Sequence, residues 1–221
     1  MVIALSAPVM ADKDFSAINN DLFDSPHMKS IKKEGKLNYK FTSNHGDTNI
    51  KDTARIDITN IRDNLRTDQK YFFFTEKNNK PFSSRKNMLG NGIFMLFLEW
   101  DIHDLERNTE GSWRHFQRRI RWAMAKNPTK KEVDIDYQGK KVKGFQYTIQ
   151  PYADDKNSTR YGDYINKYYI FTLSSEIPGT IYQIRTITPK IKAWKEGDKV
   201  VAEAHLTFTG FVPNTSPKSL D

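Results

Sequence analysis

Three arginines in the middle of the chain have the spacing expected of one helical face. Arg114, Arg118 and Arg121 lie four and three residues apart, which places them on successive turns. No acidic residue occurs between Arg114 and Glu132. Guanidinium groups bind phosphates and carboxylates through paired hydrogen bonds, and a tryptophan beside them suits a lipid or protein interface. We therefore predict a ligand-binding face made of Arg114, Arg118, Arg119, Arg121 and Trp122.

A competing interpretation is that these cations only balance the acidic segment that precedes them. Its acids are Glu99, Asp101, Asp104, Glu106 and Glu110. Exposed ion pairs contribute about 0–1 kcal/mol each, so in that case the arginines would add a little stability and no function.

The acidic segment could also carry chemistry of its own. Asp101, His103, Asp104 and Glu106 bring carboxylates and one imidazole together, but a metal site would need a further ligand from elsewhere. Glu99 follows an apolar run and could be a buried general acid with a raised pKa. A hydrolase using carboxylates in the segment 99–106 is therefore an alternative, and whether the chain is an enzyme stays open. No metal or cofactor motif occurs, so none is expected.

The predicted binding face lies on the clearest helix of the sequence, residues 113–126. Ser112 is a favourable N-cap, and Pro128 cannot continue the helix. The apolar stripe that should face the core is Trp113, Phe116, Ile120, Ala123 and Met124. Segment 101–107 also looks helical, whereas segment 93–98 is apolar at every position and fits a buried strand or a buried helix equally.

The rest of the chain favours strands. Apolar and polar residues alternate, or aromatic residues cluster, at 37–41, 54–61, 71–75, 133–137, 141–149, 168–173, 181–187 and 199–211, with turns between them. About nine sequential strands and one or two helices predict a mainly β protein with helices (α+β). We expect a curved antiparallel sheet or half-open barrel with one or two central helices packed on it. The aromatic side chains of 71–74 and of 164–171 could line an apolar pocket, although a packed core is the simpler reading.

Composition limits the partners. The 221 residues contain no cysteine, which excludes disulfides, thiol nucleophiles and cysteine-ligated metals. The formal net charge of +8 favours anionic partners such as lipid headgroups or polyanionic glycans.

The first eleven residues suggest export. Residues 2–11 read VIALSAPVMA, are uncharged, and end in a small-x-small pattern before the polar start at Asp12. We expect 1–11 to be a signal-peptide remnant, 12–212 a single β-rich domain with a helical insertion near 101–126, and 213–221 a flexible tail. No window is long and apolar enough to predict a transmembrane segment.

Four segments resemble exported proteins of Gram-negative bacteria. They are LFDSPH at 22–27, FLEWDI at 97–102, GSWRHFQRRIR at 111–121 and FTLSSEIPGTIYQIRT at 171–186. The resemblance implies a periplasmic or secreted protein and brings no particular activity with it. The expected architecture is also similar to that of periplasmic lipoprotein carriers, a likeness of fold class only.

Together these observations predict an exported binding or envelope-accessory protein for a lipidic or anionic ligand. Its partner would be anionic lipid or another envelope component, and nucleic acid is not expected because of export. The alternatives are the hydrolase described above and a polyanion-binding surface module.

The export hypothesis predicts the mature N-terminus. Produced in its host with a complete signal, the protein should begin at Asp12, because the small residues Val9 and Ala11 precede that bond. N-terminal sequencing of the protein isolated from the host measures this, and retention of residues 1–11 would refute it.

Overall fold

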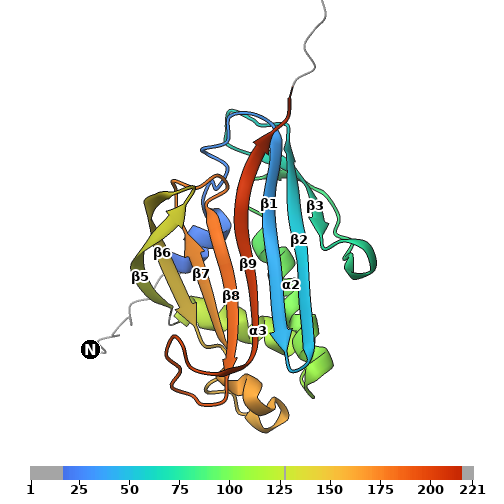
Figure 1. The fold of residues 1–221 in the computed structure, drawn as a ribbon, viewed down its shortest axis with the longest axis vertical. Coiled ribbons are helices and arrows are strands. Elements are labelled where there is room, and N and C mark those ends of the chain that lie inside the picture. The colour runs from blue at the N-terminus through green and yellow to red at the C-terminus, as the bar shows by residue number, and fades with distance from the viewer. Residues whose placement is uncertain (1–16, 127, 216–221) are drawn as a thin grey trace, which may run out of the picture.

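The computed structural model describes residues 17–126 and 128–215, which form one curved antiparallel sheet with helices on one side (Figure 1). The sheet has nine strands in the order β4-β3-β2-β1-β9-β8-β7-β6-β5. The strands are β1 (Gly35–His45), β2 (Thr48–Thr59), β3 (Thr67–Phe73), β4 (Arg85–Met88), β5 (Thr129–Tyr137), β6 (Lys140–Ile149), β7 (Tyr168–Leu173), β8 (Ile181–Pro189) and β9 (Val200–Pro213). The predicted α+β class, an open antiparallel sheet with helices packed on it, is confirmed.

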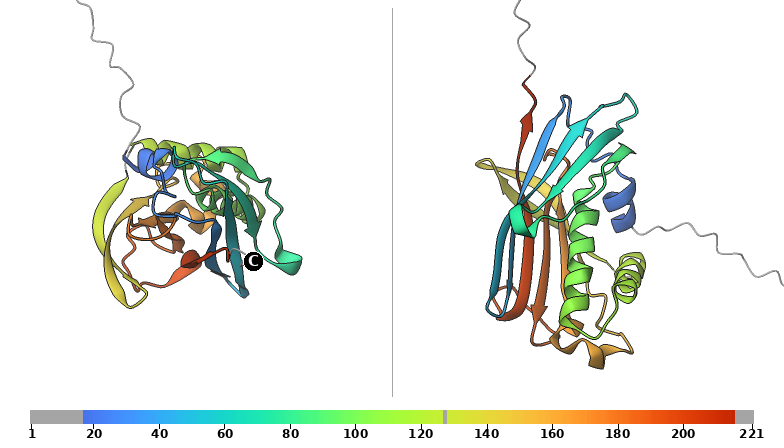
Figure 2. Two further views of the ribbon diagram at one scale, coloured as in Figure 1. Left: turned by 90° about the horizontal axis from the view of Figure 1, so that it is seen from above. Right: turned by 90° about the vertical axis from the view of Figure 1, so that its right-hand side faces the viewer.

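The helices form two further layers beside the sheet. Helix α2 lies along the concave face, and α3 crosses α2 on the side away from the sheet (Figure 2). The N-terminal turns α1 and η1 lie next to α3 in the same outer layer. The bounds are α1 (Ala17–Asn19), the π-helical turn η1 (Asn20–Asp24), α2 (Ile93–Asn108), α3 (Trp113–Lys126), and the 3-10 turns η2 (Glu76–Asn78), η3 (Ser158–Arg160) and η4 (Gly162–Asn166).

The first and last strands are neighbours at the centre of the sheet. β1 pairs with β9 from Gly35 opposite Pro213 to His45 opposite Ala202. The chain therefore builds outward from β1 to β4, crosses to the other edge through α2 and α3, and returns from β5 to β9.

Alternation along β1 sets the face that carries the core. Leu37, Tyr39 and Phe41 are buried, whereas Lys36 and Lys40 are exposed. Side chains of a strand point alternately to opposite faces, so the buried residues all face the helices. The same aromatic-rich face continues into β3 and β7, and these rings form the core with α2 rather than an open pocket.

Segment 93–98, which fits either a strand or a helix by sequence, is the first half of α2. Phe97 and Trp100 lie against Phe41 of the sheet, with ring centroids 6.3 and 4.7 Å away. Gly92 allows the close approach at the start of α2, because a Cβ there would lie 2.2 Å from the Tyr71 hydroxyl oxygen.

A buried hydrogen-bond network ties the N-terminal turns to the start of α2. The backbone N–H of Asn91 donates to His27 Nδ1 (2.9 Å), so the protonated Nε2 of that ring donates to the Asp21 carbonyl (2.6 Å). Burial lowers the pKa of His27, which keeps the imidazole neutral in this bridge. The bridge fixes η1 beside the start of α2.

Helix α3 has the bounds predicted from its cap and its proline. Phe116, Ile120, Ala123 and Met124 are buried on the predicted stripe. Trp113 departs from the prediction: it is only partly buried, because it sits at the first turn, where its ring lies 6.0 Å from that of His103 on α2.

The predicted signal remnant, residues 1–11, lies outside the described residues. Strand β9 continues to Pro213, and the Asn214 N–H donates to the Glu34 carbonyl (2.8 Å), so the first residues of the predicted tail are paired. Within 17–126 and 128–215, none of the helices combines the length and hydropathy needed to cross a bilayer.

The core packing of α3 predicts a large loss of stability for Phe116→Ala. Phe116 is fully buried, with Tyr152 and Tyr161 rings 5.4 and 5.3 Å away. Truncation leaves a cavity, so urea denaturation should show a loss of about 3–5 kcal/mol in the free energy of unfolding. Phe145→Ala is the matched control, because Phe145 is 42% exposed. Equal losses in the two variants would contradict this account of the core.

Candidate functional site

The outer face of α3 carries three exposed arginines without acidic partners. No carboxylate oxygen of the described residues lies within 4.0 Å of the guanidinium nitrogens of Arg114, Arg118 or Arg121. Arg114 lies over the Trp113 ring at 4.7 Å, and Arg118 Nη2 contacts His115 Nδ1 at 3.1 Å. The structure therefore places these three predicted site residues together on a solvent-facing row, while Arg119 lies on the adjacent flank.

The flank of α3 is bound to the loop between β6 and β7. His115 Nε2 contacts Asp155 Oδ2 at 2.5 Å, and Arg119 pairs with Asp154 and donates from Nε to the Pro151 carbonyl (2.8 Å). Burial opposes ionisation of Asp155, but the Asn157 N–H, His115 and Arg119 outweigh it and lower the pKa of that carboxyl. Arg119 is thus a structural cation, in contrast to the row on the outer face.

The expectation that the α3 arginines pair with the acids of segment 99–110 is wrong. Asp104 pairs with Arg107 on its own helix (3.0 Å), and Asp101 faces the sheet. Glu99 and Glu106 flank His103, at 3.1 and 3.3 Å. None of these acids forms an ion pair with the α3 arginines, although Glu99 lines the same groove as Arg121, so closeness in sequence gave the wrong pairing.

Trp122 lies next to the arginine row, near the C-terminal end of α3. It is 38% exposed, and Arg119 and Lys126 lie over its ring at 4.6 and 4.5 Å. A large ring flanked by cations and open to solvent has the character of an interfacial residue.

A groove that sequence reasoning missed lies between η1, α2 and α3. Its volume is about 560 Å³. It is lined by Asn19, Phe23, Asp24, Met95, Leu98, Glu99, Ile102, Gln117, Ile120, Arg121, Met124 and Ala125. The signal in the sequence was Met95, Leu98 and Ile102, spaced three and four apart, but that face is recognisable only once 93–98 is known to be helical.

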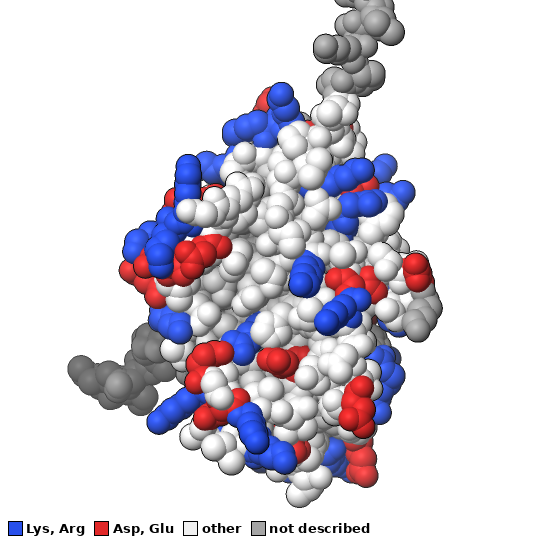
Figure 3. Space-filling model, viewed as in Figure 1, with Lys and Arg blue, Asp and Glu red and all other residues white. Residues whose placement is uncertain are grey.

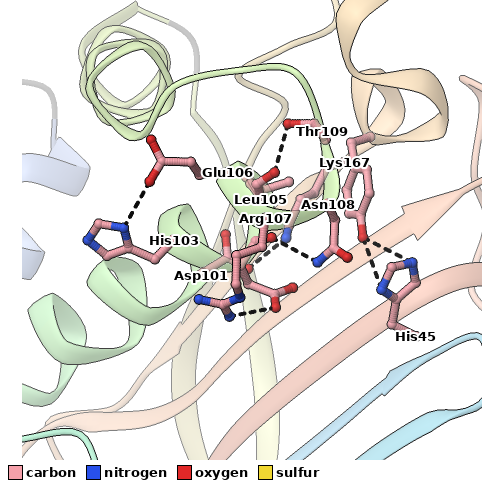
Figure 4. A network of polar contacts seen from close by, with 11 residues as sticks. His45, Asp101, His103, Leu105, Glu106, Arg107, Asn108, Thr109 and Lys167 are labelled. Carbon is pink, nitrogen blue, oxygen red and sulfur yellow. Dashed lines mark hydrogen bonds and ion pairs between the residues drawn. The ribbon is translucent and has the colours of Figure 1, made fainter.

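The side of α2 that faces the sheet holds a buried polar cluster (Figure 4). Lys167 Nζ lies 2.6 Å from Asp101 Oδ1, and the Tyr169 hydroxyl donates to Asp101 Oδ2 (2.7 Å). Burial raises the pKa of Asp101, and the charge of Lys167 opposes that shift. The Tyr152 hydroxyl lies 2.9 Å from that of Tyr169, so each polar group has a partner. The cavity beside Asp101 and Lys167 has a volume of only about 10 Å³, which leaves no room for a substrate.

The carboxylates considered for a hydrolase form contacts within the protein. Glu99, expected to be buried, is 43% exposed in its side chain. Glu106 Oε1 accepts a hydrogen bond from the Trp113 N–H (3.0 Å), which, with His103 beside it, lowers the pKa of that carboxyl. A general acid near neutral pH needs a raised pKa and access to substrate, and neither Glu106 nor the enclosed Asp101 has both. Among the described residues, no group of three or more His, Asp or Glu side chains is arranged to hold a metal ion.

The fold and its outer helical layer define an α+β protein with an open antiparallel sheet and a solvent-facing cationic helix. No family model and no curated protein matches the sequence. Two solved structures of MucB are distantly similar. The complex of MucB with MucA(peri) has a TM-score of 0.38 and 9% identity, covering 93% of this chain and 58% of that one. MucB alone gives 0.37 and 9%, covering 91% and 59%. The chain thus spans less than two thirds of the MucB chains.

A LolA-superfamily protein from Nitrosomonas europaea is also similar, with a TM-score of 0.23 and 8% identity. That match covers 92% of this chain and 96% of the other.

The buried cluster predicts a pH-dependent effect of Lys167→Met. Removing one member of a buried pair leaves an uncompensated charge, which costs about 3–5 kcal/mol. The folded-state pKa of Asp101 is raised, so this group stabilises the fold at low pH and that contribution is lost as the pH rises through the folded pKa. Without Lys167, the free energy of unfolding should fall more steeply as the pH rises. Urea denaturation should show a loss of about 3–5 kcal/mol relative to wild type at pH 7 and a smaller loss at pH 5.

Lys199→Met is the control for that experiment, because Lys199 is exposed and has no ion pair among the described residues. Adding Asp101→Asn to Lys167→Met should recover much of the loss at pH 7. Equal losses for Lys167→Met at the two pH values would show that Asp101 does not carry the effect.

Proposed function

We propose that this protein is a noncatalytic accessory protein of the cell envelope that binds anionic lipid surfaces through the outer face of α3. The observation that carries the proposal is the row of Arg114, Arg118 and Arg121, exposed and without carboxylate partners in the described part of the chain. Export, as expected from residues 1–11, would bring the protein to such surfaces.

The contrast within α3 supports a role in binding. Arg119 and His115 are held by the loop at 151–161, so the fold uses the cations of that flank. The outer row forms no ion pair with the loop, its one link to that flank being the contact of Arg118 with His115, and like charges on one helical face repel one another. A row of unpaired cations that repel one another is well suited to an anionic partner.

Apolar groups beside the row favour a lipid surface over a soluble polyanion. Trp122 on α3, Phe23 on η1 and Met95 on α2 are all exposed large side chains on the helical side of the sheet. Tryptophan and long apolar side chains insert together at the headgroup level of a lipid surface. The face of the sheet that points away from the helices has no such row. Basic and acidic side chains are interspersed there around an uncharged centre (Figure 3).

Vesicle binding tests the proposal. Basic residues near an anionic membrane contribute about 1 kcal/mol each, so replacing Arg114, Arg118 and Arg121 by Gln should weaken binding roughly 100-fold. Co-sedimentation with phosphatidylglycerol vesicles at low salt should show binding by the wild-type protein. Binding should fall steeply at high salt, because exposed charges are screened within about 10 Å at 0.1 M salt. The melting temperature should be nearly unchanged.

The matched control replaces Lys36, Lys40 and Lys51 by Gln. These exposed cations lie on the sheet, away from the helices, and the charge change is identical. Binding should be nearly retained in the control. Failure of the wild-type protein to bind at low salt, or an equal loss in both variants, would refute the proposed site. Binding to soluble heparin but not to vesicles would favour the polyanion-binding module instead.

A further inference from the structure

We infer that the groove between η1, α2 and α3 binds the hydrocarbon chain of a single anionic amphiphile, with its headgroup at Arg121. The inference deepens the proposed function and rests on it for the class of ligand. It concerns one molecule taken into a groove rather than contact with a bilayer surface.

The interior of the groove is apolar. Leu98 and Ile102 from α2 face Ile120 and Met124 from α3, and all four line the groove. Two of the exposed large hydrophobic residues of the described chain, Phe23 and Met95, belong to the same walls, at 39% and 49% exposure. The volume of about 560 Å³ is within the range of roughly 300–1,000 Å³ found for small-molecule sites.

One cation at the rim, Arg121, can bind an anionic headgroup. Arg121 on α3 is exposed and has no carboxylate within 4.0 Å among the described residues. Glu99 on α2 already contacts His103 (3.1 Å), and Asp24 stands on η1. An anionic head therefore fits on the α3 side, where Gln117 of the same helix adds a neutral hydrogen-bonding group.

The η1 wall is held in place without a ligand. Asp21 accepts a hydrogen bond from the Tyr147 hydroxyl and pairs with Lys130 (3.4 Å), which anchors η1 to the strands β6 and β5. His27 adds the bridge from Asp21 to Asn91 at the start of α2. A preformed groove loses less entropy on binding than one that must be assembled.

Calorimetry with two soluble probes tests the headgroup. Dodecanoate and dodecan-1-ol, each below its aggregation concentration and without vesicles, should both bind the full chain, and dodecanoate should bind more tightly. Arg121→Gln should weaken dodecanoate about tenfold, because a charge-assisted hydrogen bond is lost, and should leave dodecan-1-ol unchanged. Tighter binding of dodecyltrimethylammonium than of dodecanoate would overturn the assignment of Arg121.

A second pair of variants tests the apolar wall. Met95→Gln should weaken both probes about tenfold, because the methionine becomes buried by the bound chain. Met95 is half exposed in the free protein, so its loss should not unfold α2. Ile191→Gln is the control, since Ile191 is 61% exposed on the β8–β9 connection and lies outside the groove. Equal effects of the two substitutions would overturn the groove as the site.

The outcomes separate this inference from the proposed function. Vesicle binding by the wild-type protein without probe binding would refute the groove as a ligand site and leave the proposed surface binding intact. Probe binding without vesicle binding would refute the surface binding and leave the groove as a ligand site.

Discussion

Helix α2 covers the concave face of the sheet, and its burial there decides where the other elements can lie. The Phe41 ring of β1 meets Trp100 of α2 at 4.7 Å and Phe74 at 4.5 Å, so the sheet and the helix share one aromatic core. Rings in such arrangements add to the free energy gained by burying apolar area. Because α2 fills the inside of the curve, α3 and the N-terminal turns must pack on its outer side. The cationic row and the groove therefore lie on the helical layer rather than inside the sheet.

Much of the fold follows from local sequence patterns. Alternation identified most strands, and the two limits of α3 followed from Ser112 and Pro128. Segment 93–98 gave no periodic signal, since the sheet buries one side of α2 and the outer helical layer covers much of the other. The edge strand β4 was missed because its residues, Arg85–Met88, are charged or polar in three of four positions.

The site was predictable only in part. The shared face of Arg114, Arg118 and Arg121 follows from helix geometry, but the partners of the neighbouring flank do not. Asp155 lies 40 residues from His115, and Lys167 lies 66 residues from Asp101. Only the tertiary fold brings these groups together, whereas reasoning from nearby sequence favoured acids that turn out to face elsewhere. The groove needs three elements at once, so no local pattern describes it.

The pairing of β1 with β9 has a consequence for the order of events in folding. These strands form the middle of the sheet, yet most of the described chain separates them. Contacts between distant segments cost loop entropy before they add stability, so topologies dominated by them fold slowly. During synthesis the two halves of the sheet cannot join until the ribosome has released its last strand. The central pairing of the sheet is therefore the last to form, and the edges of β1 and β8 stay unpaired on that side until β9 arrives.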